Sequence, residues 1–124
     1  MTSGILWGVL AAPLAVEGKY SNGQPHHVTL QFGVDRADWK QWIGLEFEAI
    51  ATVEAWNGRV QAIALKLPDY IPCANQHPHV TVSWLTKASP VESNEMLGSR
   101  YSYRLFNQVV QFKIEFLEWE EVIE

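Results

Sequence analysis

The stretch EFEAIATVEAWNGRVQAIALKL, residues 46–67, decides the expected fold. At its centre lies Asn57-Gly58, a dipeptide that favours a two-residue hairpin turn because both residues tolerate a positive φ. The segments on either side, Glu46 to Trp56 and Arg59 to Leu67, are both prone to form strands. We therefore expect two antiparallel strands joined at this turn, as part of an antiparallel sheet.

Further strands are predicted on both sides of this hairpin. Residues 5–12 begin with a continuous apolar run, which is typical of a buried strand covered on both faces. Residues 27–32 alternate between polar and apolar side chains, as in a strand with one polar face. Val80–Leu85 is another expected strand, and the pattern from Tyr101 to Trp119 indicates one or two more. In total the sequence predicts about six or seven strands.

Helices are expected to be few and short. Residues 35–43 fit either a short helix capped by Asp35 or an irregular turn. Residues 89–98 are typical of a turn followed by a short helix, with Ser93 as the N-cap and Gly98 as the stop.

The composition is that of one globular domain. The chain has 124 residues, of which 48% are hydrophobic and 19% are charged, so a disordered or low-complexity protein is excluded. This length leaves no room for a second core of ordinary size. The expected fold class is α+β: one domain over residues 1–124, with a mainly antiparallel sheet and few short helices.

Charge and cysteine content narrow the function further. Nine Lys and Arg are scattered among fourteen Asp and Glu, so no basic patch for duplex nucleic acid is expected. The only cysteine, Cys73, excludes an internal disulfide and fits a reducing compartment. The longest apolar stretch, residues 4–16, is too short to span a bilayer, and residues 1–3 lack the positive charge of a signal peptide. We expect a cytoplasmic protein with no membrane partner.

The most informative pattern is a motif that occurs twice. Residues 24–30, QPHHVTL, and residues 76–82, QHPHVTV, match in Gln, His, Val and Thr at an offset of 52 residues. Each copy begins an expected strand, and residues i and i+2 of a strand share a face. The pairs that share a face are His27 with Thr29 and His79 with Thr81. The residues expected in the core are Val28, Leu30, Val80 and Val82.

Two such motifs facing each other across a groove present two imidazoles and two hydroxyls. One imidazole can accept a proton from an attacking oxygen while the other protonates the leaving oxygen, as phosphodiester cleavage requires. Threonine hydroxyls can bind the non-bridging phosphate oxygens. This scheme needs no metal. Because the motifs are alike, the sequence does not assign which histidine is the base.

The two His-Val-Thr motifs resemble the signature of the 2H phosphoesterases, named for their two histidines. Three further segments resemble, more specifically, the cyclic phosphodiesterase module of fungal tRNA ligases. These are Leu67-Pro68, IPCANQHPHVTV at residues 71–82, and PVESN at residues 90–94. The resemblance implies a two-lobed α+β fold with pseudo-twofold symmetry and both motifs in a central groove. It implies His27 and His79 as the proton-transfer pair and Thr29 and Thr81 as the phosphate-binding hydroxyls.

The function implied by this resemblance is that of a metal-independent cyclic nucleotide phosphodiesterase. Its substrate is expected to be a small-molecule nucleotide or an RNA terminus with a 2′,3′-cyclic phosphate, opened to a 2′-phosphate as in RNA repair. Two alternatives stay open. The protein could degrade cyclic oligonucleotide messengers, as a viral counter-defence protein would, or bind a nucleotide without turnover. The oligomeric state is not indicated.

Three further residues are candidates for stacking on a base or lining the rim of the groove: Trp84, Tyr20 and His77. Most aromatic side chains of a small domain belong to its core, which is the competing interpretation.

A zinc site is the alternative use of the four histidines. Pro78 separates two of them, and neither a cysteine pair nor a carboxylate at ligand spacing completes such a site. Cys73 shows no sign of activation as a nucleophile. We expect no metal and no cofactor. The histidines concerned are His26, His27, His77 and His79.

Overall fold

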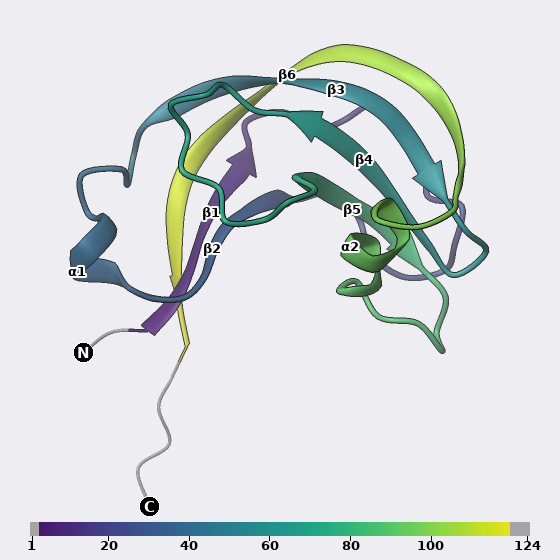
Figure 1. Ribbon diagram of the computed structural model, residues 1–124, viewed down its shortest axis with the longest axis horizontal. Coiled ribbons are helices and arrows are strands. Elements are labelled where there is room, and N and C mark those ends of the chain that lie inside the picture. Colours follow the sequence, from purple (N-terminus) through teal and green to yellow (C-terminus); the bar gives the residue numbers. More distant parts are fainter. Residues whose placement is uncertain (1–2, 120–124) are drawn as a thin grey trace, which may run out of the picture.

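The computed structural model describes residues 3–119 (Figure 1). These residues form β1 (Ser3–Leu10), β2 (His27–Asp35), α1 (Arg36–Trp39), β3 (Glu46–Trp56), β4 (Val60–Lys66), β5 (His79–Trp84), α2 (Glu92–Leu97) and β6 (Ser102–Glu118). Within this part of the chain, neither helix has the length and apolar character needed to cross a membrane. The expected class, a small and mainly antiparallel β domain with few short helices, is confirmed.

The predicted hairpin is formed by β3 and β4. Gly58 has a φ of 87°, a conformation that side chains disfavour, so glycine suits this position of the turn. The side chain of Asn57 closes the turn, because its Oδ1 accepts hydrogen bonds from the N–H groups of Arg59 and Val60 at 3.0 Å each. The pattern of residues 46–67 therefore predicted both strands and their connection correctly.

The six strands close into one sheet in the order β1-β2-β5-β4-β3-β6, with every neighbouring pair antiparallel. The last strand, β6, is 17 residues long and pairs with both β3 and β1. In Figure 1 it is the long yellow-green ribbon that curves over the molecule. Of the one or two strands expected between Tyr101 and Trp119, the structure has one. The two-lobed arrangement with pseudo-twofold symmetry stays a prediction.

The junction between β2 and β5 is the shortest ladder of the sheet, with the single residue pair Val28↔Val80. The loop that leads from β4 to β5 adds further bonds to β2. Ala74 donates its N–H to the carbonyl of Leu30 at 2.9 Å, and Gln31 Nε2 donates to the carbonyl of Pro72 at 3.3 Å. Loop and strand together therefore hold this side of the sheet closed.

The main core fills the interior of the closed sheet. The residues that the motif pattern places in the core, Val28, Leu30, Val80 and Val82, are at most 1% exposed, as expected. Phe112 of β6 is fully buried and stacks on Phe47 of β3, with ring centroids 5.3 Å apart. The apolar residues of β2 and β5 therefore point into the core. The histidines and threonines of the two motifs lie on the opposite face of these strands.

The first strand differs from its prediction. It spans Ser3–Leu10 rather than residues 5–12, and its burial alternates along the chain. Leu6 is fully buried, whereas Ile5 and Trp7 line a cavity on the other face. The run is apolar on both faces because one face meets the core and the other meets this cavity.

One helix is capped as expected and the other is not. The side chain of Asp35 caps α1 by accepting the N–H of Ala37 at 3.0 Å. The prediction of Ser93 as the N-cap of α2 is wrong, because the helix begins at Glu92 and its N-cap, Val91, makes no side-chain hydrogen bond. Ser93 lies within the helix, fully buried, where a hydroxyl of β5 satisfies its own hydroxyl. Gly98 follows the last turn, as predicted.

Candidate active site

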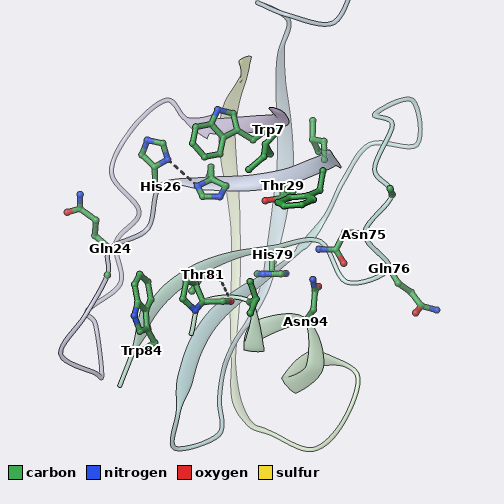
Figure 2. Close-up of a pocket in the computed structure, with 18 residues that line it drawn as sticks. Trp7, Gln24, His26, Thr29, Asn75, Gln76, His79, Thr81, Trp84 and Asn94 are labelled. Carbon is green, nitrogen blue, oxygen red and sulfur yellow. Dashed lines mark hydrogen bonds between the residues drawn. The ribbon is translucent and has the colours of Figure 1, made fainter. Parts of the chain in front are cut away.

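A cavity of about 830 Å³ lies where β2 and β5 meet (Figure 2). Its walls come from β1, β2, β5, the loops that precede β2 and β5, and the segment around the start of α2. The volume falls within the range typical of small-molecule sites. The pocket is therefore large enough for a nucleotide.

The two His-x-Thr motifs lie side by side in this pocket. All four of their polar side chains line it: His27, Thr29, His79 and Thr81. The pairing of Val28 with Val80 explains this, since it places the central residues of the two motifs opposite each other. The antiparallel direction then brings the histidine of each motif toward the threonine of the other.

His79 is held by a backbone carbonyl. Its Nδ1 lies 2.7 Å from the carbonyl oxygen of His77, and because a carbonyl can only accept, Nδ1 must carry the hydrogen. In the neutral ring Nε2 is therefore the acceptor. Burial lowers the pKa of His79, and the bond to His77 opposes this shift without cancelling it.

His27 has a different setting. Its ring packs against Trp7, with centroids 4.2 Å apart, and its Nδ1 lies 3.2 Å from Nδ1 of His26. Burial lowers the pKa of His27 to about 4, with smaller contributions from the neighbouring His26 and His79. At neutral pH the ring of His27 in the folded protein is therefore uncharged.

This low pKa makes the stability of the domain depend on pH. The unfolded chain protonates His27 near pH 6.5, whereas the folded chain does so only near pH 4. Between these values the unfolded state binds more protons, so stability is lost as the pH falls. Because the ring is partly exposed and solvent screens it, we expect a loss of about 1–2 kcal/mol in the free energy of unfolding.

Urea unfolding at about pH 7 and about pH 4.5 measures this loss, with a His27→Gln variant as the comparison. The variant should lose less free energy of unfolding between the two pH values than the wild-type chain does. The same pH dependence in both proteins would show that His27 titrates normally in the folded state.

Thr81 is supported by a residue that sequence reasoning assigned to another role. Its Oγ1 lies 3.0 Å from Oγ of the fully buried Ser93 and 3.5 Å from the carbonyl of Pro90. Ser93 thus orients the hydroxyl of Thr81 from behind. The only signal in the sequence was its place shortly after the second motif.

Of the three candidates for the rim, Trp84 lines the pocket and the other two do not. Trp84 packs directly against Gly23, where a β-carbon would collide with its ring. The hydroxyl of Tyr20 instead accepts the N–H of Gly58 at 2.9 Å. The ring of His77 lies beside Gly98, where an added β-carbon would come within 3.2 Å of its Nε2. His77 serves the site through its carbonyl.

Several other pocket residues were missed by sequence reasoning. Trp7, Phe32, Asn75 and Asn94 also line the pocket. Asn75 accepts the N–H of His77 with its Oδ1 at 3.0 Å, so its Nδ2 is left to donate elsewhere. For Trp7 a signal existed, because a strand that is apolar on both faces needs a second apolar surface to cover it.

A family model, the fungal tRNA ligase phosphodiesterase domain, matches residues 45–122, which is more than half of the chain. The chain belongs to this family. The resemblance to the cyclic phosphodiesterase module of fungal tRNA ligases is thereby confirmed, and the activity class of the family is that of phosphodiesterases, which are hydrolases. A search of curated proteins finds no match.

The family match covers β3, β4, β5 and β6 and therefore includes the second motif. The first motif, on β2, lies outside it. In this member of the phosphodiesterase family β1 and β2 fill the place between β6 and β5 in the closed sheet. The pairing of β2 with β5 places the first motif at the site, and this placement does not depend on the family match.

The remaining nucleophile and metal candidates can be placed as well. Among residues 3–119, no three His, Cys, Asp or Glu side chains gather in an arrangement that could hold a metal ion. Cys73 is half-buried, and burial raises the pKa of its thiol, which disfavours the reactive thiolate. In this family member the thiol donates to the carbonyl of Asn75 at 3.5 Å, a contact that fits a structural role for Cys73.

Proposed function

We propose that the protein is a metal-independent hydrolase that opens cyclic nucleotide phosphates, including 2′,3′-cyclic phosphates at RNA ends. The observation that carries this proposal is the pairing of Val28 with Val80, which sets both His-x-Thr motifs on one pocket. The family match supports phosphodiester chemistry. A cytoplasmic role in RNA repair is part of the same proposal.

The hydrogen bonds of the histidines favour one division of roles. Neutral His79 carries its hydrogen on Nδ1, so its Nε2 is free to take a proton from the attacking water. The water oxygen bonds to phosphorus while the bond from phosphorus to the ribose 3′ oxygen breaks. That oxygen receives a proton from the imidazolium of His27, and the product is a 2′-phosphate. The negative charge of the bound phosphate favours the protonated form of His27.

The hydroxyls and one aromatic side chain complete the proposed site. Thr29 and Thr81 donate hydrogen bonds to the non-bridging oxygens, where negative charge accumulates in the transition state. Ser93 holds Thr81 in place for this task. Trp84, which packs against Gly23, offers the nucleobase of the substrate a flat surface for stacking. The antiparallel relation of the motifs supports the expected pseudo-twofold symmetry around this point.

A second candidate substrate is a cyclic oligonucleotide, as in the messenger-degrading alternative. The observation that favours it is the volume of about 830 Å³, which is more than one nucleotide needs. The chemistry at the scissile phosphate would be the same.

The test is turnover in excess EDTA of three substrates: adenosine 2′,3′-cyclic phosphate, a short RNA with a 2′,3′-cyclic phosphate end, and a cyclic dinucleotide. We expect hydrolysis that survives EDTA, with a 2′-phosphate product from the first two, identified by phosphorus NMR. Binding of these compounds without hydrolysis would replace the proposal with a non-catalytic module. Loss of activity with EDTA, and its return with zinc, would overturn the metal-independent mechanism.

A further inference from the structure

The pocket proposed to bind the phosphodiester carries no permanent charge among the described residues that line it. None of the described residues that line it is Lys, Arg, Asp or Glu. Four of the basic residues form ion pairs elsewhere on the described chain. These are Lys19 and Arg104 with Glu54, Arg36 with Glu118, and Arg59 with Glu92.

Among the described residues that line the pocket, the groups that can become cationic are the imidazoles of His26, His27 and His79. The two motif rings, His27 and His79, both have lowered pKa values, mainly through burial. A ligand anion placed between them can draw a proton onto one ring. A second proton would meet repulsion from the first, because the two rings already disfavour each other's charge.

The rest of the wall is largely apolar and aromatic. Figure 2 shows Trp7 toward the top of the pocket and Trp84 toward its lower left, so the two indoles lie on different sides. Phe32 and Val91 also line the pocket and are 72% and 76% exposed, so they lie toward its mouth. A second anionic group bound against these side chains would lose water without gaining a counter-ion, which is costly.

We propose that the pocket selects nucleotides whose only bound negative charge is the scissile phosphodiester, with an aromatic base and an uncharged sugar occupying the rest. A further phosphate inside the pocket is selected against, so among the proposed substrates the cyclic mononucleotide is favoured over the RNA end and over the cyclic oligonucleotide. This inference rests on the proposed function for its choice of phosphodiester. The selection against a further phosphate, which we call the charge rule, rests on the residues that line the pocket.

A matched pair of substrates tests the rule: adenosine 2′,3′-cyclic phosphate with a free 5′-hydroxyl, and the same compound with a 5′-phosphate. We expect kcat/KM to be about tenfold or more higher for the 5′-hydroxyl compound. Equal values, or a preference for the 5′-phosphate, would overturn the charge rule while leaving the hydrolase intact.

A gain of charge at the mouth gives a second readout. Val91→Lys should shift the ratio of the two kcat/KM values toward the 5′-phosphate compound by about fivefold or more, since a lysine can pair with the added phosphate. Val91→Gln supplies a polar chain without charge and should leave that ratio within about twofold of its original value. The same shift in both variants would show that bulk, not charge, controls selection.

Calorimetric binding of the same two compounds separates the charge rule from the proposed hydrolysis. If neither compound is hydrolysed, the proposed function fails. In that case a lower Kd for the 5′-hydroxyl compound supports the charge rule, and equal Kd values overturn it. Binding of neither compound at millimolar concentration overturns both.

Discussion

Replacing His79 with asparagine is expected to lower kcat for a nucleoside 2′,3′-cyclic phosphate by about 100- to 10,000-fold. Asparagine is the sharpest substitution because its Nδ2 can still donate to the carbonyl of His77, as Nδ1 of the imidazole does at 2.7 Å. The local structure is thereby preserved. The lost element is the Nε2 lone pair, which we propose accepts the proton of water.

Steady-state kinetics with thermal unfolding measure this effect. The melting temperature of His79→Asn should stay close to that of the wild-type chain. Tyr70→Ala is the control, because this side chain is 61% exposed and lies outside the pocket, so kcat should be unchanged. A fall in kcat of less than tenfold in a folded His79→Asn variant would remove His79 from the proton-transfer pair.

Replacing Gln61 with leucine is expected to lower the free energy of unfolding by about 3 kcal/mol. Gln61 is fully buried and its Oε1 accepts from the N–H of Lys19 at 2.8 Å and from Ser83 Oγ at 2.6 Å. Its Nε2 donates to the carbonyl of Glu17 at 2.9 Å and to the buried carboxylate of Glu54 at 3.1 Å. Leucine fills the space but leaves these partners unsatisfied, and each buried orphan costs about 1–3 kcal/mol.

Urea denaturation of Gln61→Leu beside Gln111→Leu checks this result. Gln111 is exposed and bonds only to the exposed carboxylate of Glu48 among its described side-chain contacts, so its replacement should cost about 0.5 kcal/mol or less. Equal losses in the two variants would show that the buried network contributes little.

Replacing Gln61 should also change the shape of the pocket and so weaken substrate binding. Gln61 anchors the segment at residues 17–19, which leads into the pocket-lining Gly23 and Gln24. We therefore expect KM to rise more than kcat falls in Gln61→Leu, because the segment shapes the wall and takes no part in proton transfer.

Much of the site followed from local patterns. Asn57-Gly58 predicted the hairpin because turn chemistry is set by neighbouring residues. The alternation after His27 and after His79 predicted which side chains point into the core, since a strand has a strict period of two. That both motifs line one pocket was an inference from the family resemblance, and the pairing of Val28 with Val80 agrees with it.

Other features depend on contacts between distant segments, which a pattern in one segment does not contain. The second apolar face of β1 could not be assigned until the pocket was known. Serine is a residue type that commonly caps helices, but the hydroxyl of Ser93 bonds to Thr81, twelve residues away. The contact of His26 with His27 likewise depends on the path of the loop before β2.

The antiparallel pairing of Val28 with Val80 has a stereochemical consequence. An antiparallel pair has a local twofold axis, and if the proposed phosphodiester is centred on that axis, a half-turn exchanges the two His-x-Thr motifs together with the two non-bridging oxygens. A substrate turned end for end would therefore meet an imidazole and a hydroxyl on each side again, but with the supporting contacts of His77, His26 and Ser93 exchanged. The motifs alone do not distinguish the two prochiral oxygens of the phosphorus, and that choice falls to the unlike walls of Trp7 and Trp84.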